Sequence, residues 1–281
     1  MAILTIPYDE YAALPGIRAS HLKNYRTSPR HGLYGEMVPL EDRDSFRAGR
    51  AAHTALMEPR RFLLDYLLWP EIRDPDTGIG GARNNNAWKA FKADADQAGK
   101  TVLTLAQYET ANAIADAVFA HPPALEILAG AKFEWVLTWT DEETGIECKA
   151  RPDSLAAPIV ADLKTTATIN ERLFMATAER LGYWHAQAFY RMGAAANGIG
   201  DTRHCLIAVE AKPPHDVAAF WLDDADLYTA ECEVRDLLRL VATCRESGVY
   251  PGQYPEPVRL TRPGWAQASE YEITDIVSFG G

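Results

Sequence analysis

The sequence predicts an α/β fold in which a small mixed central β-sheet is flanked by helices. Residues 132–140 alternate apolar and polar side chains, as in a half-buried strand, and a short turn leads into a second strand. Residues 159–164 form an apolar run interrupted by two charges, which predicts an interior strand. Helical periodicity precedes and follows these strands. We therefore expect a sheet of about three to five strands with helices packed against it.

The chain of 281 residues is long enough to bury a sizeable core, and 47% of its residues are hydrophobic. We find no internal repeat and no linker-like stretch. We expect a single domain with a helical N-terminal part over about 1–131 and a sheet core over about 132–281. The sequence shows no signal peptide and no membrane-spanning stretch. A soluble, cytoplasmic protein without a membrane partner is the expectation.

The N-terminal part is predicted to be mainly helical. Residues 16–34 are expected to form a turn, a helix capped by Ser20, and a closing turn at Ser28-Pro29. The alanine-rich segment 45–57 predicts a helix that Pro59 ends. The remaining expected elements are a long loop at 70–86, helices at 87–98 and 105–121, and a short strand at 101–104.

The C-terminal part is predicted to contain the sheet. A strand at 132–140, a turn at 141–145 and a strand at 146–151 form a hairpin, which the interior strand at 159–164 follows. The remaining expected elements are helices at 170–181 and 183–198, strands at 203–210 and 217–222, a long helix at 224–247, and a proline-rich surface tail at 251–263.

Cysteine spacing and charge limit the possible classes of function. The four cysteines form no Cys-x-x-Cys pair, which argues against a zinc knuckle, an iron–sulfur cluster or a disulfide framework. The formal net charge of −11 looks unsuited to binding nucleic acid, yet residues 1–61 hold nine Lys or Arg against seven Asp or Glu. A locally basic surface can bind phosphate on an acidic protein, so the net charge does not exclude DNA.

Asp162 and Lys164 lie within the predicted interior strand. Side chains two positions apart in a strand point to the same face, so this carboxylate and ammonium project together. Their burial is costly unless they pair or bind a ligand, and a structural ion pair is the simplest alternative. Asp153, which follows Pro152, adds a second carboxylate or merely starts a turn. Two carboxylates and an ammonium would suit an oxygen-preferring cation and an activated water.

The chain resembles a known nuclease superfamily. It contains Arg151-Pro152-Asp153 followed by Asp162-Leu163-Lys164-Thr165-Thr166, which is similar to the signature of the PD-(D/E)xK nucleases. More closely, the chain resembles the RecE-like exonucleases of phages and prophages, also called the exonuclease VIII family. Other similar segments are an opening motif at 16–22, a helix with Gly49, His53 and Glu58-Pro59, the segment 99–104, the strand with Glu134, and residues 144–148. The resemblance implies a restriction-endonuclease-like core.

The resemblance also implies a metal site. His53, Asp153 and Asp162 would bind a divalent metal, and the backbone carbonyl of Leu163 would be a further oxygen ligand. Oxygen ligands with one imidazole suit Mg²⁺ or Mn²⁺, and the imidazole favours Mn²⁺. By itself, a lone helical histidine such as His53 is more typical of a core or surface position.

Four further residues have catalytic roles by resemblance. Lys164 would orient or deprotonate the attacking water, or offset the charge of the phosphorane, and the sequence leaves these roles open. Glu134 would contact that water or a second metal. The superfamily often carries Gln-x-x-x-Tyr on the helix after the lysine strand, whereas here Gln187 is followed by Tyr190 one position early. Both spacings share a helical face, so the pair could still serve. The alternative places Gln187 on the surface and Tyr190 in the core.

The activity implied by the resemblance is metal-dependent 5′-to-3′ exonuclease digestion of linear double-stranded DNA. This digestion would leave 3′ single-stranded tails for a RecT-like single-strand annealing recombinase. The family commonly forms a homo-oligomeric ring around DNA ends, and the basic N-terminal segment would line its channel. Two alternatives remain open at this point. One is a structure-specific or single-strand endonuclease of the same fold, and the other is a non-catalytic DNA-end-binding protein.

Overall fold

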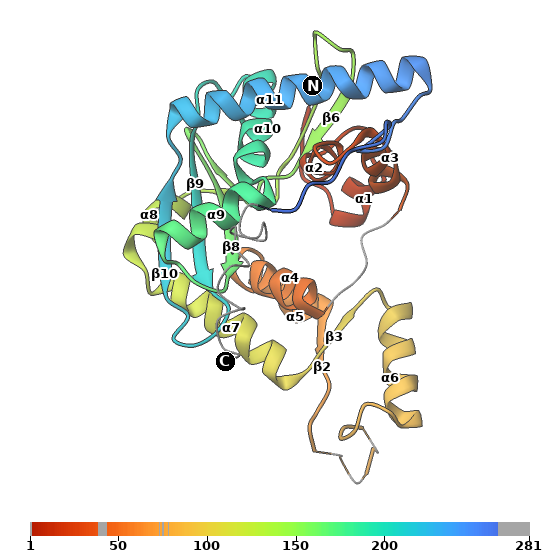
Figure 1. Ribbon diagram of the computed structural model, residues 1–281. Coiled ribbons are helices and arrows are strands. Elements are labelled where there is room, and N and C mark those ends of the chain that lie inside the picture. The colour runs from red at the N-terminus through yellow and green to blue at the C-terminus, as the bar shows by residue number, and fades with distance from the viewer. Residues whose placement is uncertain (1, 39–43, 73, 75, 78, 264–281) are drawn as a thin grey trace, which may run out of the picture.

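The structure is a computed structural model that describes residues 2–38, 44–72, 74, 76–77 and 79–263, without the side chains of 44–46. Its centre is a five-stranded mixed sheet with the order β10-β9-β8-β7-β4 (Figure 1). Only β8 and β9 pair in parallel, and their neighbours are antiparallel. The strands are β4 (Lys132–Phe133), β7 (Ser154–Ala156), β8 (Ile159–Thr166), β9 (Arg203–Glu210) and β10 (Val217–Trp221). The predicted α/β fold is therefore confirmed.

Helices cover both faces of this sheet. Val160 of β8 packs with Phe189 on the face covered by α9, α10 and α11, whereas Leu163 packs with Ile114 on the face covered by α4, α7 and α8. The helices are α4 (Asp44–Met57), α7 (Leu105–Phe119), α8 (Pro122–Leu128), α9 (Glu171–Leu181), α10 (Tyr183–Ala196) and α11 (Asp224–Ser247). Strand β8 lies between β7 and β9, so its polar residues are held in the interior.

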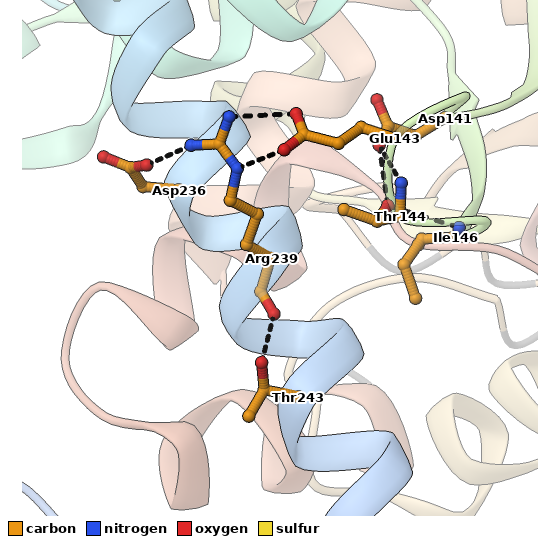
Figure 2. Close-up of polar contacts among 7 residues, drawn as sticks. All are labelled: Asp141, Glu143, Thr144, Ile146, Asp236, Arg239 and Thr243. Atoms are coloured by element: carbon orange, nitrogen blue, oxygen red, sulfur yellow. Dashed lines mark hydrogen bonds and ion pairs between the residues drawn. The ribbon is translucent and has the colours of Figure 1, made fainter.

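A second, three-stranded sheet has the order β1-β5-β6 and packs on the same core as α10. Its strands are β1 (Ala2–Leu4), β5 (Val136–Thr140) and β6 (Glu147–Ala150). The turn between β5 and β6 is tied to α11, because Arg239 donates to both carboxylate oxygens of Glu143 at 2.6 and 2.9 Å and also to Asp236 (Figure 2). Asp141 accepts hydrogen bonds from Thr144 and so closes the turn.

The rest of the N-terminal part consists of short helices and a two-stranded parallel sheet of β2 and β3. With α6, this small sheet projects away from the central sheet (Figure 1). The elements are α1 (Tyr8–Ala13), α2 (Ala19–Tyr25), α3 (Pro29–Met37), α5 (Pro59–Asp65), β2 (Tyr66–Leu68), α6 (Asn86–Gln97) and β3 (Thr101–Leu103). Among the described residues, no helix has the length and apolar character needed to cross a membrane.

The structure corrects two helix boundaries. Arg18, and not Ser20, is the N-cap of α2, so Ser20 lies inside that helix. Ser28-Pro29 begins a helix where a closing turn was predicted. The Ser28 hydroxyl accepts the His31 N–H at 3.3 Å, and Pro29 takes the first helical position, where its missing N–H costs nothing.

The predicted single strand at 132–140 is wrong. The chain forms β4, breaks at Glu134 and Trp135, and resumes as β5 in the other sheet. Glu134 adopts a left-handed backbone conformation with φ of 58°, which a strand cannot contain. The alternation of apolar residues continues across this break, so the periodicity alone could not reveal it.

Most other expected elements are found near their predicted bounds, including the hairpin of β5 and β6. The structure adds β1, β2, β7, α1, α5 and α8, which the sequence did not indicate. The described residues of 70–85 contain no helix or strand, as predicted for a loop. Residues 251–263 also lack helix and strand and are mostly exposed; the Pro251 carbonyl accepts a hydrogen bond from the Arg30 N–H of α3.

Candidate active site

Three potential metal ligands meet at one point, although they come from different parts of the chain. Within the described residues, one group of His and carboxylate side chains is close enough to hold a metal ion: His53, Glu134 and Asp153, whose ligand atoms lie within 4.8 Å of one another. His53 is on α4, which reaches the end of β8 near Thr165. The His53 Nδ1 lies 3.3 Å from Asp153 Oδ2.

Backbone hydrogen bonds hold Asp153 in place. The Leu163 N–H donates to Asp153 Oδ2 at 2.8 Å, and the Glu134 N–H donates to the Asp153 carbonyl at 3.1 Å. Burial alone would raise the pKa of Asp153, but the adjacent His53 and the Lys164 ammonium hold it well below its usual range. Asp153 is therefore ionised near neutral pH and ready to bind a cation.

Asp162 and Lys164 form an ion pair beside this group. Asp162 is 2% exposed, so its charge is almost completely removed from water. Burial, followed by the charge of Asp153, raises the pKa of Asp162 to about 6, even though Lys164 opposes this shift. Burial acts against the charge of Lys164, but the Asp162 and Asp153 carboxylates raise the Lys164 pKa above its ordinary value. Lys164 is thus an ammonium in this arrangement.

Glu134 owes its position to a strained backbone and to Arg151. The Arg151 Nε lies 3.0 Å from Glu134 Oε2 and donates to the Glu134 carbonyl at 3.3 Å. Burial and then the charge of Asp153 raise the pKa of Glu134 to about 7. A left-handed non-glycine residue costs about 1–3 kcal/mol and is often found at functional sites. Such strain persists only where surrounding contacts enforce it, as Arg151 does here.

Two tyrosines of α1 support Arg151 from its other side. The guanidinium lies 5.5 Å from the ring centroid of Tyr8 and 6.0 Å from that of Tyr11. Lys149, which is 3% exposed, anchors α1 because its ammonium donates to the carbonyls of Tyr11, Ala12 and Leu14. No sequence pattern indicates a role for these residues, apart from the position of Arg151 beside Pro152-Asp153.

The two predicted residues of α10 have different surroundings. Tyr190 packs against the core around α10, and burial, followed by the charges of Asp162 and Asp153, raises the pKa of its hydroxyl. Gln187 is fully buried, with its Oε1 2.8 Å from His204 Nδ1 of β9, so the surface alternative is wrong. The structure also adds Tyr183, whose ring centroid lies 5.0 Å from the Lys164 Nζ.

The donor set fits a divalent cation. Glu134, Asp153 and Asp162 bring three carboxylates to a mostly buried site, where burial and then repulsion by the Asp153 charge raise the pKa values of Glu134 and Asp162. A bound cation would relieve this repulsion. Carboxylate oxygens with one imidazole are suitable ligands for Mg²⁺ or Mn²⁺. The Leu163 N–H donates to Asp153, and the predicted role of the Leu163 carbonyl as a metal ligand stays a prediction.

Fold and donor set together define a PD-(D/E)xK-like domain. The sequence matches the family described as a PDDEXK-like domain of unknown function (DUF3799) over residues 19–258. Because this match covers most of the chain, the protein belongs to that family. No curated protein matches the sequence.

Solved structures share the fold at low sequence identity. The crystal structure of a candidate exonuclease from Eubacterium rectale has a TM-score of 0.61 and 14% identity, covering 89% of this chain and 90% of that chain. An alkaline exonuclease from Laribacter hongkongensis covers 71% of this chain and 97% of its own at 13% identity, with a TM-score of 0.29. The first likeness shows a common fold, whereas the second score is too low to carry an argument.

Proposed function

We propose that this protein is a metal-dependent deoxyribonuclease that hydrolyses phosphodiester bonds. The observation that carries this proposal is the convergence of His53, Glu134 and Asp153 beside the buried Asp162–Lys164 pair in a PD-(D/E)xK-like fold. A structural ion pair alone would not require the further carboxylates, whose mutual repulsion costs stability unless a cation offsets it.

Each residue of the site would have a distinct role. His53, Asp153 and Asp162 would hold Mg²⁺ or Mn²⁺, and Glu134, whose ligand atom lies within 4.8 Å of those of His53 and Asp153, would be a further ligand. When bound, such a metal lowers the pKa of a coordinated water and stabilises charge on a phosphate. Lys164, as an ammonium, would donate a hydrogen bond to the attacking water or to a phosphate oxygen. Its raised pKa favours these roles over deprotonation of the water.

The finer proposal is a 5′-to-3′ exonuclease acting on linear duplex DNA. Support comes from the resemblance to RecE-like exonucleases and from the fold shared with the candidate exonuclease. From the same resemblance, the products would be 3′ single-stranded tails for a RecT-like annealing recombinase, and the enzyme would act as a homo-oligomeric ring. Endonuclease cleavage or DNA-end binding without hydrolysis are the alternatives that the experiment must separate.

The test compares the parent with Asp162→Asn, Lys164→Gln and the control Asp236→Asn, which removes an exposed carboxylate on α11. Substrates are linear duplexes labelled at either the 5′ or the 3′ end and a closed circular duplex, each with Mg²⁺ or Mn²⁺. We expect the parent and Asp236→Asn to release the 5′ label early and to spare the circle. Asp162→Asn and Lys164→Gln should be slower by at least about 100-fold.

Each other outcome has a defined meaning. If both site variants digest DNA as fast as the parent, the site assignment is wrong. If the parent releases no nucleotide with either metal, the protein is not a nuclease. Cleavage of the circle would replace the exonuclease proposal with an endonuclease.

A further inference from the structure

The joint between α9 and α10 lies next to Lys164. Gly182 ends α9 and begins α10 in a left-handed conformation with φ of 73°, and the next residue, Tyr183, places its ring 5.0 Å from Lys164 Nζ. A Cβ at Gly182 would lie only 3.1 Å from Arg26 Nη1 of α2. Because residue 182 is glycine, the Arg26 guanidinium can lie directly over the joint. The next residue is Tyr183, whose ring contacts Lys164.

Three exposed cations gather at this joint. Lys23 lies in the last turn of α2, Arg26 is the C-cap of that helix three residues later, and Arg180 is in the last turn of α9. Burial, followed by the charges of Arg180 and Arg26, lowers the pKa of Lys23, which is consistent with all three being neighbours.

One of these cations, Arg26, is paired with a carboxylate, and both Glu179 and Glu233 lie close to His185 at the start of α10. Arg26 pairs with Glu179 at 3.1 Å, and the two side chains are 31% and 61% exposed; solvent-accessible pairs contribute only about 0–1 kcal/mol. Among the described residues, Lys23 and Arg180 form no ion pair. Two unpaired cations beside a third that is held only by a partly exposed ion pair favour the binding of a polyanion.

We propose that Lys23, Arg26 and Arg180 form a phosphate-binding track that holds the backbone of the DNA strand next to the scissile phosphodiester. This inference rests on the proposed nuclease function and deepens it. The strand would leave Lys164, pass the ring of Tyr183 and continue over Gly182 to the three cations. The track explains how a protein with a net charge of −11 holds DNA, because the cations are local to the site.

The test measures binding without hydrolysis. A fluorescein-labelled linear duplex is titrated with protein in EDTA, and anisotropy gives Kd over a series of KCl concentrations. The variants are Lys23→Ala, Arg26→Ala and Arg180→Ala, and the matched control is Arg239→Ala. This control also removes one exposed positive charge, but Glu143 and Asp236 already occupy Arg239 (Figure 2). Circular dichroism melting checks that each variant is folded.

We expect each of the three variants to reduce the slope of log Kd against log salt by about 0.9, which corresponds to one lost phosphate contact. Arg239→Ala should leave the slope unchanged. The track is refuted if the slope of log Kd against log salt is the same for the three variants as for the parent. It is also refuted if the parent does not bind the duplex. A third outcome is that the three variants reduce the slope but the parent never hydrolyses DNA. This result would refute the nuclease proposal and leave the track in place.

Discussion

At the scale of single residues, Arg151 decides where the Glu134 carboxylate lies. Its Nε contacts both the side chain and the backbone carbonyl of Glu134, and its own side chain is only 9% exposed. Within the described residues, the hydrogen bonds and ion pairs of the Arg151 side chain are all made with Glu134. We therefore regard it as a positioning residue for the metal site.

Arg151→Gln should weaken Mn²⁺ binding and slow hydrolysis by about 10–100-fold, because residues that orient metal ligands have effects of this size. Mn²⁺ affinity, measured by calorimetry, and the rate of nucleotide release are the two readouts. Arg151→Lys keeps the charge and should restore part of both. Equal Mn²⁺ affinity in the parent and in Arg151→Gln would contradict a positioning role.

The sequence alone could indicate the residues that carry charge into apolar surroundings, but not those that support them. Asp162 and Lys164 stand out because a buried strand rarely contains such charges. The positions of Tyr8, Tyr183 and Arg26 around the site depend on the packing of α1, α10 and α2. Contacts between residues so far apart in the chain leave no local pattern that could be recognised in the sequence.

At the scale of elements, the break between β4 and β5 places Glu134 in the site. Two variants isolate the strain of this break, since Glu134→Gly and Glu134→Ala both remove the carboxylate. Only glycine adopts a φ of 58° without steric cost. Glu134→Gly should therefore be more stable than Glu134→Ala by about 1 kcal/mol, as measured by urea unfolding. Equal stability would mean that the left-handed conformation is absent or relaxes in the variants.

The same break shows why element prediction from the sequence was incomplete. Alternation across 132–140 correctly indicated extended chain, yet the same pattern is compatible with one strand or with two strands in different sheets. Ser28-Pro29 is a similar case, since a serine before proline suits either a turn or the first turn of a helix. The long helices and β8 were predicted well because their own periodicity or apolar character determines them.

At the scale of the whole molecule, a buried histidine should make stability depend on pH. Burial, and then the charge of Arg191, lowers the pKa of His204 to about 3, and its ring nitrogens contact Gln187 and Thr202. The unfolded chain takes up this proton near pH 6.5, whereas the folded protein does not until about pH 3. His204 therefore contributes stability above pH 6.5 that is lost as the pH falls toward 3.

The raised pKa values of Asp162 and Glu134 change the free energy of unfolding with pH in the opposite direction. Both carboxylates are present in the parent and in His204→Gln, so a comparison of the two proteins isolates the contribution of His204. The free energy of unfolding of the parent, relative to that of the variant, should fall by about 2 kcal/mol between pH 7 and pH 5. Urea unfolding at both pH values measures this difference. A relative stability that does not change with pH would show that His204 is protonated in the folded state.

The separation of the proposed metal ligands in the chain has a consequence for how the protein is made. His53 and Asp153 are a hundred residues apart, and Asp162 follows still later. During synthesis, the helix that carries His53 is complete long before the strands that carry the carboxylates leave the ribosome. A partly made chain therefore has no complete site, and contacts of such long range are also among the slower ones to form. If the proposed function holds, the nascent chain therefore cannot hydrolyse DNA until Asp153 and Asp162 have been made.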